Sequence, residues 1–167
     1  MAAADQLSLV MGADLLTSLL GEGRRSRMVE RLREQLKIAE TVDMDLTVLE
    51  QGSLVTLEVC CAEQQLHAVE SAVHEQLHRL DTDPVEAWEL ERALNLVGNG
   101  LRFALESTGQ VAAMAASQTL WGRQQSLLEP LQQLERWTTD ELRGELFPRL
   151  QPEKACTLIA RPGTSQG

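Results

Sequence analysis

The sequence predicts an α+β domain in which helices pack on one face of a mainly antiparallel sheet. Three observations lead to this prediction. The chain has 167 residues and is 43% hydrophobic, which suits one globular domain with a substantial core. Apolar residues recur at helical spacing over most of the chain, while two adjacent segments alternate with the period of a strand. A short turn joins those two segments, so we expect an antiparallel hairpin.

The first part of the chain predicts two helices and then the hairpin. Residues 5–20 place apolar side chains three and four positions apart, which is typical of an amphipathic helix, and residues 25–37 repeat the pattern. Residues 42–49 alternate apolar and polar side chains and therefore predict a half-buried strand. A turn at residues 51–53 precedes a second strand at residues 54–59.

The rest of the chain is predicted to be mostly helical. Asp83 as N-cap and Pro84 at the first helical position mark the start of one helix, and Gly109 marks a break before another. The expected helices are residues 62–80, 84–106, 111–121, 126–136 and 139–150, followed by a last apolar strand at residues 155–160. Three strands make a thin sheet, so we expect an exposed sheet edge that pairs with another chain.

The boundaries and charge of the chain give further expectations. We expect a single domain over residues 1–163 and a short tail over residues 164–167. The net charge of −10 argues against nucleic acid as a partner, because phosphate binding needs clustered positive charge.

No apolar run is long enough to span a membrane, and no targeting signal is present. Two of the three Cys residues are adjacent and pair poorly, so we expect reduced thiols and a cytoplasmic protein.

Residues 74–78 read HEQLH and match the H-E-x-x-H motif of zinc proteases, in which two His bind the metal and Glu acts as base. On a helix, His74 and His78 would lie about 100–140° from the apolar face, and Glu75 about 160° from it on the opposite side. A zinc site also needs a third ligand, which no second motif announces. We therefore expect exposed side chains and no metal site here. The alternatives are a zinc site of His74, Glu75 and His78, or adventitious metal binding by the two His.

Five segments in order resemble insulinase/pitrilysin-type peptidases, the family that includes mitochondrial processing peptidase. They are LLGEGRRSRM at residues 19–28, LRE at 32–34, ELERA at 89–93, TTDEL at 138–142 and CTLIARPG at 156–163. The order and spacing of these segments are more specific than any one of them, and the resemblance covers nearly the whole chain. It implies an α+β domain that pairs with a second half around a closed chamber.

The resemblance further implies the half that carries no zinc. In that family the catalytic half has H-x-x-E-H on its first long helix, whereas residues 5–20 contain no His. HEQLH lies on a later helix, where the family places no ligands. The implied chain is thus a C-terminal type domain with no catalytic residue and no cofactor of its own, and zinc is expected on the partner half. The family's domains also begin with a strand before the first helix, which has no counterpart here.

The non-zinc half of active family members contributes an Arg and a Tyr that hold substrate, in a segment like L-R-E-x-x-G-L-x-Y-x-V. Residues 32–42 align with it without a gap, so the resemblance implies that Arg33 contacts substrate, while Glu40 stands where Tyr would be. A phenol can donate a hydrogen bond to a developing oxyanion, whereas an ionised carboxylate repels it.

The expected function is that of a non-catalytic peptidase half. It would complete the chamber beside a zinc-bearing half, in the same or a separate polypeptide, and contact peptide substrate through Arg33 or a sheet edge. Self-association through the exposed edge is a further expectation. Two alternatives remain: a scaffold protein that kept the fold without a peptidase role, and an independent H-E-x-x-H metalloprotease.

Overall fold

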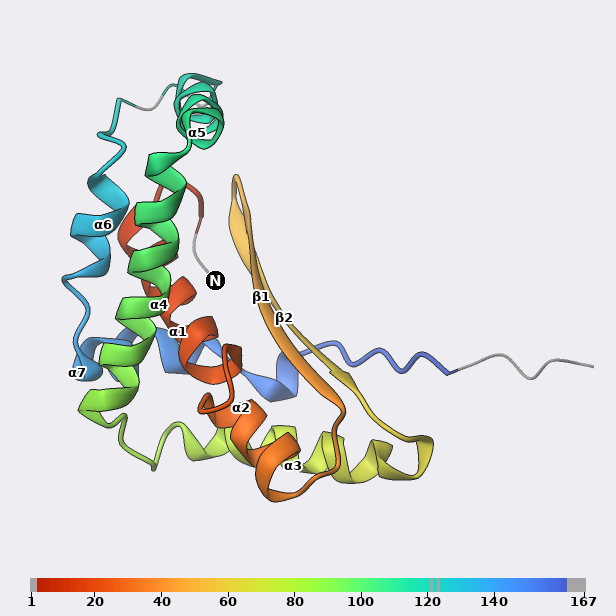
Figure 1. Ribbon diagram of the computed structural model, residues 1–167. Helices are drawn as coiled ribbons and strands as arrows, with labels where there is room; N and C mark the ends of the chain where they lie inside the picture. The colour runs from red at the N-terminus through yellow and green to blue at the C-terminus, as the bar shows by residue number, and fades with distance from the viewer. Residues whose placement is uncertain (1–2, 121, 123, 162–167) are drawn as a thin grey trace, which may run out of the picture.

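A computed structural model describes residues 3–120, 122 and 124–161 of the chain (Figure 1). It confirms the α+β class, with helices and one antiparallel hairpin. The longer elements are α1 (Leu7–Gly21), β1 (Thr41–Leu49), β2 (Gly52–Cys60), α3 (Leu66–Arg79), α4 (Ala87–Glu106) and α5 (Thr108–Leu120). The shorter ones are α2 (Arg27–Val29), η1 (Glu30–Gln35), η2 (Glu63–Gln65), α6 (Glu129–Leu134), α7 (Thr139–Glu141), η3 (Leu142–Leu146), η4 (Phe147–Arg149) and η5 (Pro152–Lys154).

Helix α1 is the centre of the molecule. It lies between the hairpin on one side and α4 and α6 on the other, as Figure 1 shows for the hairpin and α4. From Val10 to Gly21, every residue of this helix except Asp14 is buried. The amphipathic pattern expected for this segment therefore understates its burial, because a helix that is covered from several directions is apolar on almost every side.

The predicted antiparallel hairpin is confirmed, and the structure gives its register. Val42 faces Val59, Met44 faces Leu57, and this side of the hairpin packs against α1. The next positions point the other way, because side chains alternate along a strand. Asp43 therefore lies opposite Glu58 on the outer side.

The predicted third strand is wrong. Residues 155–160 form no strand, and β1 and β2 make up the only sheet among the described residues. Leu158 is 90% exposed and Ile159 is 49% exposed, and no strand of the described residues pairs with this apolar segment. A strand needs a partner for its backbone N–H and C=O groups, and composition alone does not provide one. The predicted tail at residues 164–167 lies outside the described residues, and the single-domain boundary remains a prediction.

Two helix starts differ from the prediction. Helix α4 is capped by Glu86 rather than Asp83, and Glu89 completes the capping box by accepting a hydrogen bond from the Glu86 N–H at 2.9 Å. Pro84 consequently precedes the helix. The break before α5 falls at Ser107, and Gly109 lies inside that helix. The expected helix end at residue 121 lies outside the described residues.

Two of the predicted helices begin as α-helices and continue as π-helices. The segment at residues 25–37 begins as α2 and continues as π-helical η1, and the segment at residues 139–150 runs through α7 into π-helical η3. The predicted start of the latter is confirmed, since the Thr138 side chain accepts a hydrogen bond from the Glu141 N–H at 3.3 Å. No helix in the described part of the chain is long and apolar enough to cross a bilayer.

Close packing of Trp137 on α1 depends on Gly12. The buried indole donates from Nε1 to the Ser8 carbonyl at 3.0 Å, which holds the ring against the helix. A Cβ at Gly12 would overlap the ring of Trp137 and would lie 2.7 Å from Leu146 Cδ1.

We expect Gly12→Ala to destabilise the protein by about 1–3 kcal/mol, because the added methyl group overpacks this contact. Gly100→Ala in α4 is the matched control. A Cβ there meets nothing within 4 Å, so this change should stabilise the protein by roughly 0.5–1 kcal/mol. Urea unfolding of both variants measures the two effects, and a neutral Gly12→Ala would contradict the packing described here.

Candidate functional site at the open edge of β1

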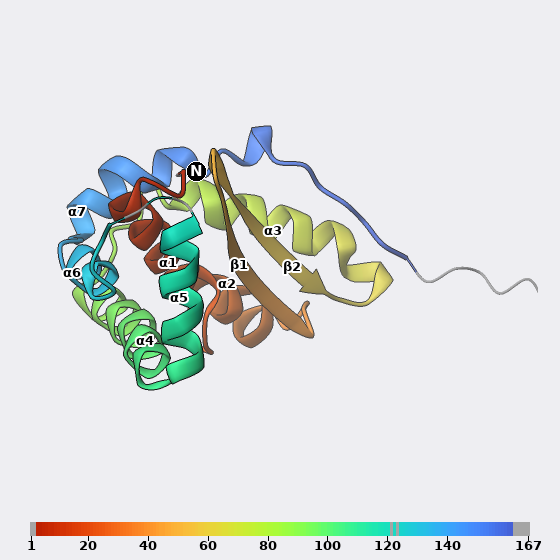
Figure 2. The same cartoon turned by 90° about the horizontal axis from the view of Figure 1, so that it is seen from above.

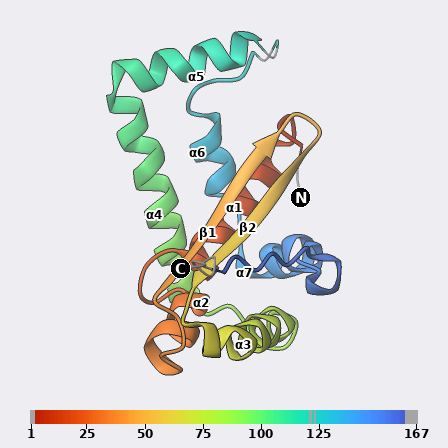
Figure 3. The same ribbon diagram turned by 90° about the vertical axis from the view of Figure 1, so that its right-hand side faces the viewer.

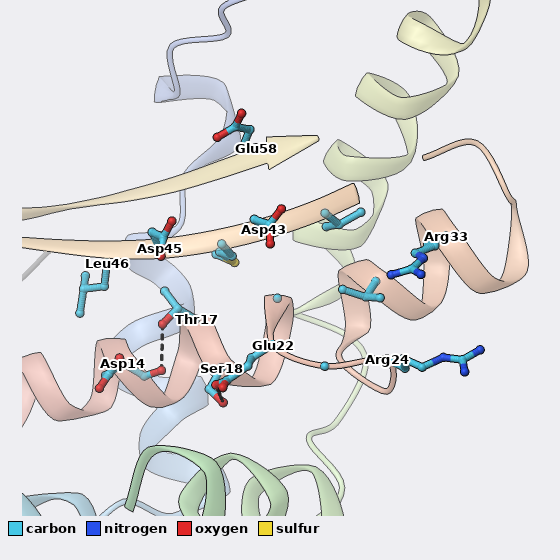
Figure 4. A pocket seen from close by; sticks show the side chains of 15 residues that line it. Asp14, Thr17, Ser18, Glu22, Arg24, Arg33, Asp43, Asp45, Leu46 and Glu58 are labelled. Carbon is cyan, nitrogen blue, oxygen red and sulfur yellow. Dashed lines mark hydrogen bonds between the residues drawn. The ribbon is translucent and has the colours of Figure 1, made fainter. Parts of the chain in front are cut away.

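A cavity of about 800 Å³ lies beside β1 (Figure 4). Residues 42–46 of β1, five in a row, line it. Because successive side chains of a strand point to opposite faces, a cavity that meets five consecutive residues runs along the strand's backbone edge. In the part of the chain that the structure describes, only β2 pairs with β1, so the edge away from β2 is open.

Helix α1 and the turn after it form the opposite wall of this groove. The residues that contribute are Asp14, Thr17, Ser18, Gly21 and Glu22. A Cβ at Gly21 would overlap Met44 Cβ, so this glycine allows β1 to approach the helix closely. The Ser18 hydroxyl donates to Glu22 Oε2 at 2.8 Å and fixes that carboxylate on the rim.

The groove is mainly acidic, with two cationic side chains. Five acidic residues, Asp14, Glu22, Asp43, Asp45 and Glu58, are among those that line it, together with Arg24 and Arg33. Burial raises the pKa of Asp14, and the nearby negative charge of Glu22 raises it further. Both effects disfavour the ionised form of this carboxyl.

Arg33 lies on the groove, as Figure 4 shows. Its Nε is 4.0 Å from Glu34 Oε1, and half of the side chain is exposed. Glu34 itself accepts two hydrogen bonds from Arg24, at 2.9 and 3.3 Å, and these bonds lower the pKa of Glu34. Arg33 is therefore held only loosely by its neighbour. Glu40 is not among the residues that line the groove; it precedes β1 and is exposed.

The H-E-x-x-H residues lie on α3, apart from the groove. His78 is exposed, His74 is partly buried, and the Glu75 carboxylate lies 3.5 Å from Arg31 Nη2 and 3.7 Å from Arg79 Nη1. Among the described residues, no three His, Cys, Asp or Glu side chains converge in a way that could hold a metal ion. The donor set therefore does not fit zinc, and the absence of a metal site in this chain remains a prediction.

Two residues of α4 hold the turn between α1 and α2, a role that was not predicted from the sequence. Arg27 donates to both carboxylate oxygens of Glu89, at 2.7 and 2.8 Å, in a mostly buried ion pair. Arg92 donates to the carbonyl of Glu22 at 2.6 Å and to those of Ser18 and Leu19 at 3.2 Å. Arg92 thus adds hydrogen bonds to carbonyls at the end of α1, where the intrahelical partners run out. The available signal was the ELERA segment, since Glu89 and Arg92 are three apart and share a helix face.

Opposing effects act on the pKa of the Glu89 carboxyl. Burial alone would raise its pKa, but hydrogen bonds from Arg27 and from the Glu86 N–H, with the positive charges of Arg27 and Arg92, lower it overall. Glu89 is consequently ionised in the folded protein and paired with Arg27.

Comparison with known proteins identifies the family. Residues 3–97 match the family described as the peptidase M16 inactive domain. This chain belongs to that family. The expected resemblance to insulinase-type zinc peptidases is therefore confirmed.

Two curated relatives are called uncharacterized zinc proteases. YmxG of Bacillus subtilis is 23% identical over 150 residues, which cover 89% of this chain and 37% of the relative. SCO5738 of Streptomyces coelicolor is 25% identical over 145 residues, or 86% of this chain and 31% of the relative. The chain thus spans about a third of the length of these relatives.

A solved structure shares the fold. The inactive peptidase domain of a proposed zinc protease from Bordetella parapertussis superposes with a TM-score of 0.75 at 17% identity. The match covers 86% of this chain and 76% of that one.

We expect Glu89→Gln to destabilise the protein by about 3 kcal/mol at pH 7, because it leaves the Arg27 charge mostly buried without its counter-ion. The folded-state pKa of Glu89 lies below its ordinary value of 4.5. The ion pair therefore adds stability above about pH 4.5, and that stability is lost as the pH falls through the lowered pKa. The difference between wild type and variant should shrink on acidification.

Urea unfolding at several pH values measures this difference. Glu135→Gln is the matched control, because Glu135 pairs with Arg102 at 3.8 Å in an exposed Arg–Glu pair. This control should change the free energy of unfolding by less than about 1 kcal/mol. Equal effects of the two substitutions would contradict the assigned importance of the Arg27–Glu89 pair.

Proposed function

We propose that this chain is the non-catalytic half of a zinc metallopeptidase, which completes a substrate chamber beside a zinc-bearing half. In this proposal, extended peptide lies along the open edge of β1 and contacts Arg33. The observation that supports it most directly is the groove itself, which opens on the strand's backbone edge and includes Arg33. Membership of the inactive-domain family and the zinc-protease names of the relatives support the identity of the partner.

An open strand edge can recognise peptide with little regard to its sequence. Its outward N–H and C=O groups bond the backbone of an added strand. Five residues at about 3.3 Å each give a track of roughly 17 Å, enough for a peptide of about five residues. Arg33 at the groove would add a charged hydrogen bond to a peptide carbonyl or carboxylate.

This chain would bind and orient peptide without performing the cleavage. In the proposed complex the zinc and its activated water belong to the partner half, since the donors described in this chain do not fit the metal. Glu40, in the position implied for a phenol donor, has no hydroxyl to donate and does not line the groove, so it would not stabilise a developing oxyanion. Transition-state stabilisation would therefore also come from the partner.

Hydrogen exchange tests the proposed peptide site directly. The complex of this chain with its zinc-bearing half, in inactive form with the metal removed, is incubated with an extended peptide. We expect slower exchange of backbone amides at residues 42–46, because the peptide accepts hydrogen bonds from the β1 edge. Amides of β2 are the internal control and should not change. Unchanged exchange at residues 42–46 under saturating peptide would contradict the site. Association of the halves without peptide cleavage by the zinc-loaded complex would favour the scaffold alternative.

Arg33→Ala should lower kcat/KM of the zinc-loaded complex about tenfold, the equivalent of about 1.4 kcal/mol, through loss of one charged hydrogen bond. Thermal unfolding should be unchanged, because the Arg33 side chain is half exposed and only loosely paired. Arg102→Ala removes a similarly exposed guanidinium from α4 and should leave kcat/KM unchanged. Equal activity of wild type and Arg33→Ala would remove Arg33 from the site.

A further inference from the structure

Residues 155–160, with the sequence ACTLIA, form an extended segment that carries no charge. Leu158 and Ile159 are exposed, and no regular structure includes them. A short, apolar, uncharged and β-prone segment is typical of a strand that lacks its neighbour. Figure 2 shows the segment running outward along α3, away from α1 and α4. The chain therefore presents an unpaired strand-forming segment.

The same chain presents an unpaired strand edge, in the groove along β1. Lys154 and Arg161 bracket the uncharged segment, while five acidic residues and two Arg residues are among those that line the groove. The charges at the ends of the segment thus complement the groove. Six residues span roughly 20 Å in a strand, comparable with the open length of β1. Donor and acceptor therefore match in length and in the sign of their charge.

Within one copy, the segment lies on the β2 side of the hairpin, whereas the groove runs along β1. Arg161 Nη1 lies 3.3 Å from Glu63 Oε1, and Glu63 follows the end of β2. Figure 3 shows the segment arriving from the side of α7, where β2 lies, whereas β1 faces the side of α4. The open edge of β1 is the one away from β2.

We propose that two copies of this chain associate by exchange, with residues 155–160 of each copy adding as a strand to the β1 edge of the other. Such an arrangement is closed and two-fold symmetric, because each copy is both donor and acceptor. It rests on the same groove as the proposed function. The dimer fills the groove that peptide would use, so self-association and peptide binding exclude one another.

Sedimentation equilibrium of the full chain tests the exchange. We expect a monomer–dimer equilibrium for the wild type in the micromolar range. Consecutive side chains of a strand face opposite ways, so the double variant Leu158→Asp/Ile159→Asp places one charge in the contact whatever the register. The dimer dissociation constant of this variant should rise at least tenfold.

The matched control is Phe103→Asp/Leu120→Asp, which charges two exposed apolar residues on α4 and α5. It should dimerise like the wild type. A wild type that remains monomeric up to about millimolar concentration overturns the proposal, as does a Leu158→Asp/Ile159→Asp variant that dimerises equally well. Slowed amide exchange on β2 rather than on β1 upon dimerisation would also overturn it.

A synthetic peptide of residues 153–161 separates this inference from the proposed function. The peptide should bind the monomeric Leu158→Asp/Ile159→Asp variant at residues 42–46 and should dissociate the wild-type dimer. If the wild type is monomeric but unrelated extended peptides still bind β1, the exchange fails and the proposed function stands. If the dimer forms by exchange but unrelated peptides fail to bind the monomeric variant, the proposed peptide role fails and the exchange stands.

Discussion

Burial of α1 on nearly every side is the constraint on which the rest of the structure depends. Its leucines at positions 15, 16, 19 and 20 are fully buried, and such a helix needs covering layers in several directions. The β1–β2 hairpin provides one layer, and α4 and α6 provide another. A two-stranded hairpin is marginal by itself in water, so the position of β1 is fixed by the helix beneath it.

The groove follows from how α1 ends. Gly21 lets β1 approach the end of α1 closely. The turn that follows Gly21 lines the groove with residues 42–46, and the edge of β1 stays open there. Residues of α4, far away in the sequence, hold this turn. Glu89 accepts hydrogen bonds from Arg27, and Arg92 donates hydrogen bonds to carbonyls at the end of α1. The site therefore depends on contacts between segments more than sixty residues apart.

Local patterns predicted the hairpin and most helices because periodicity and turns are local properties. They failed where contacts with residues far away in the sequence determine whether an element forms or where it begins. Residues 155–160 have the composition of a strand but no neighbour, and Glu86 caps α4 in preference to Asp83 where Glu89 also pairs with Arg27. Resemblance pointed to Arg33, which does line the groove. Asp14 could not be assigned to it, because a helix that is apolar on almost all sides does not indicate which way its one charged side chain points.

Under the proposed function, the open edge of β1 makes closure of the chamber more favourable when peptide is bound than when the groove is empty. In the groove as it stands, water can bond the outward N–H and C=O groups of β1. A partner half that covers the groove would exclude this water, and each backbone group left unpaired would cost about 1–3 kcal/mol. Closure over an empty edge is thus disfavoured, whereas closure over a bound strand leaves those groups satisfied. Under the proposed function, a half without metal would then control whether the chamber closes, because it carries the edge that must be filled first.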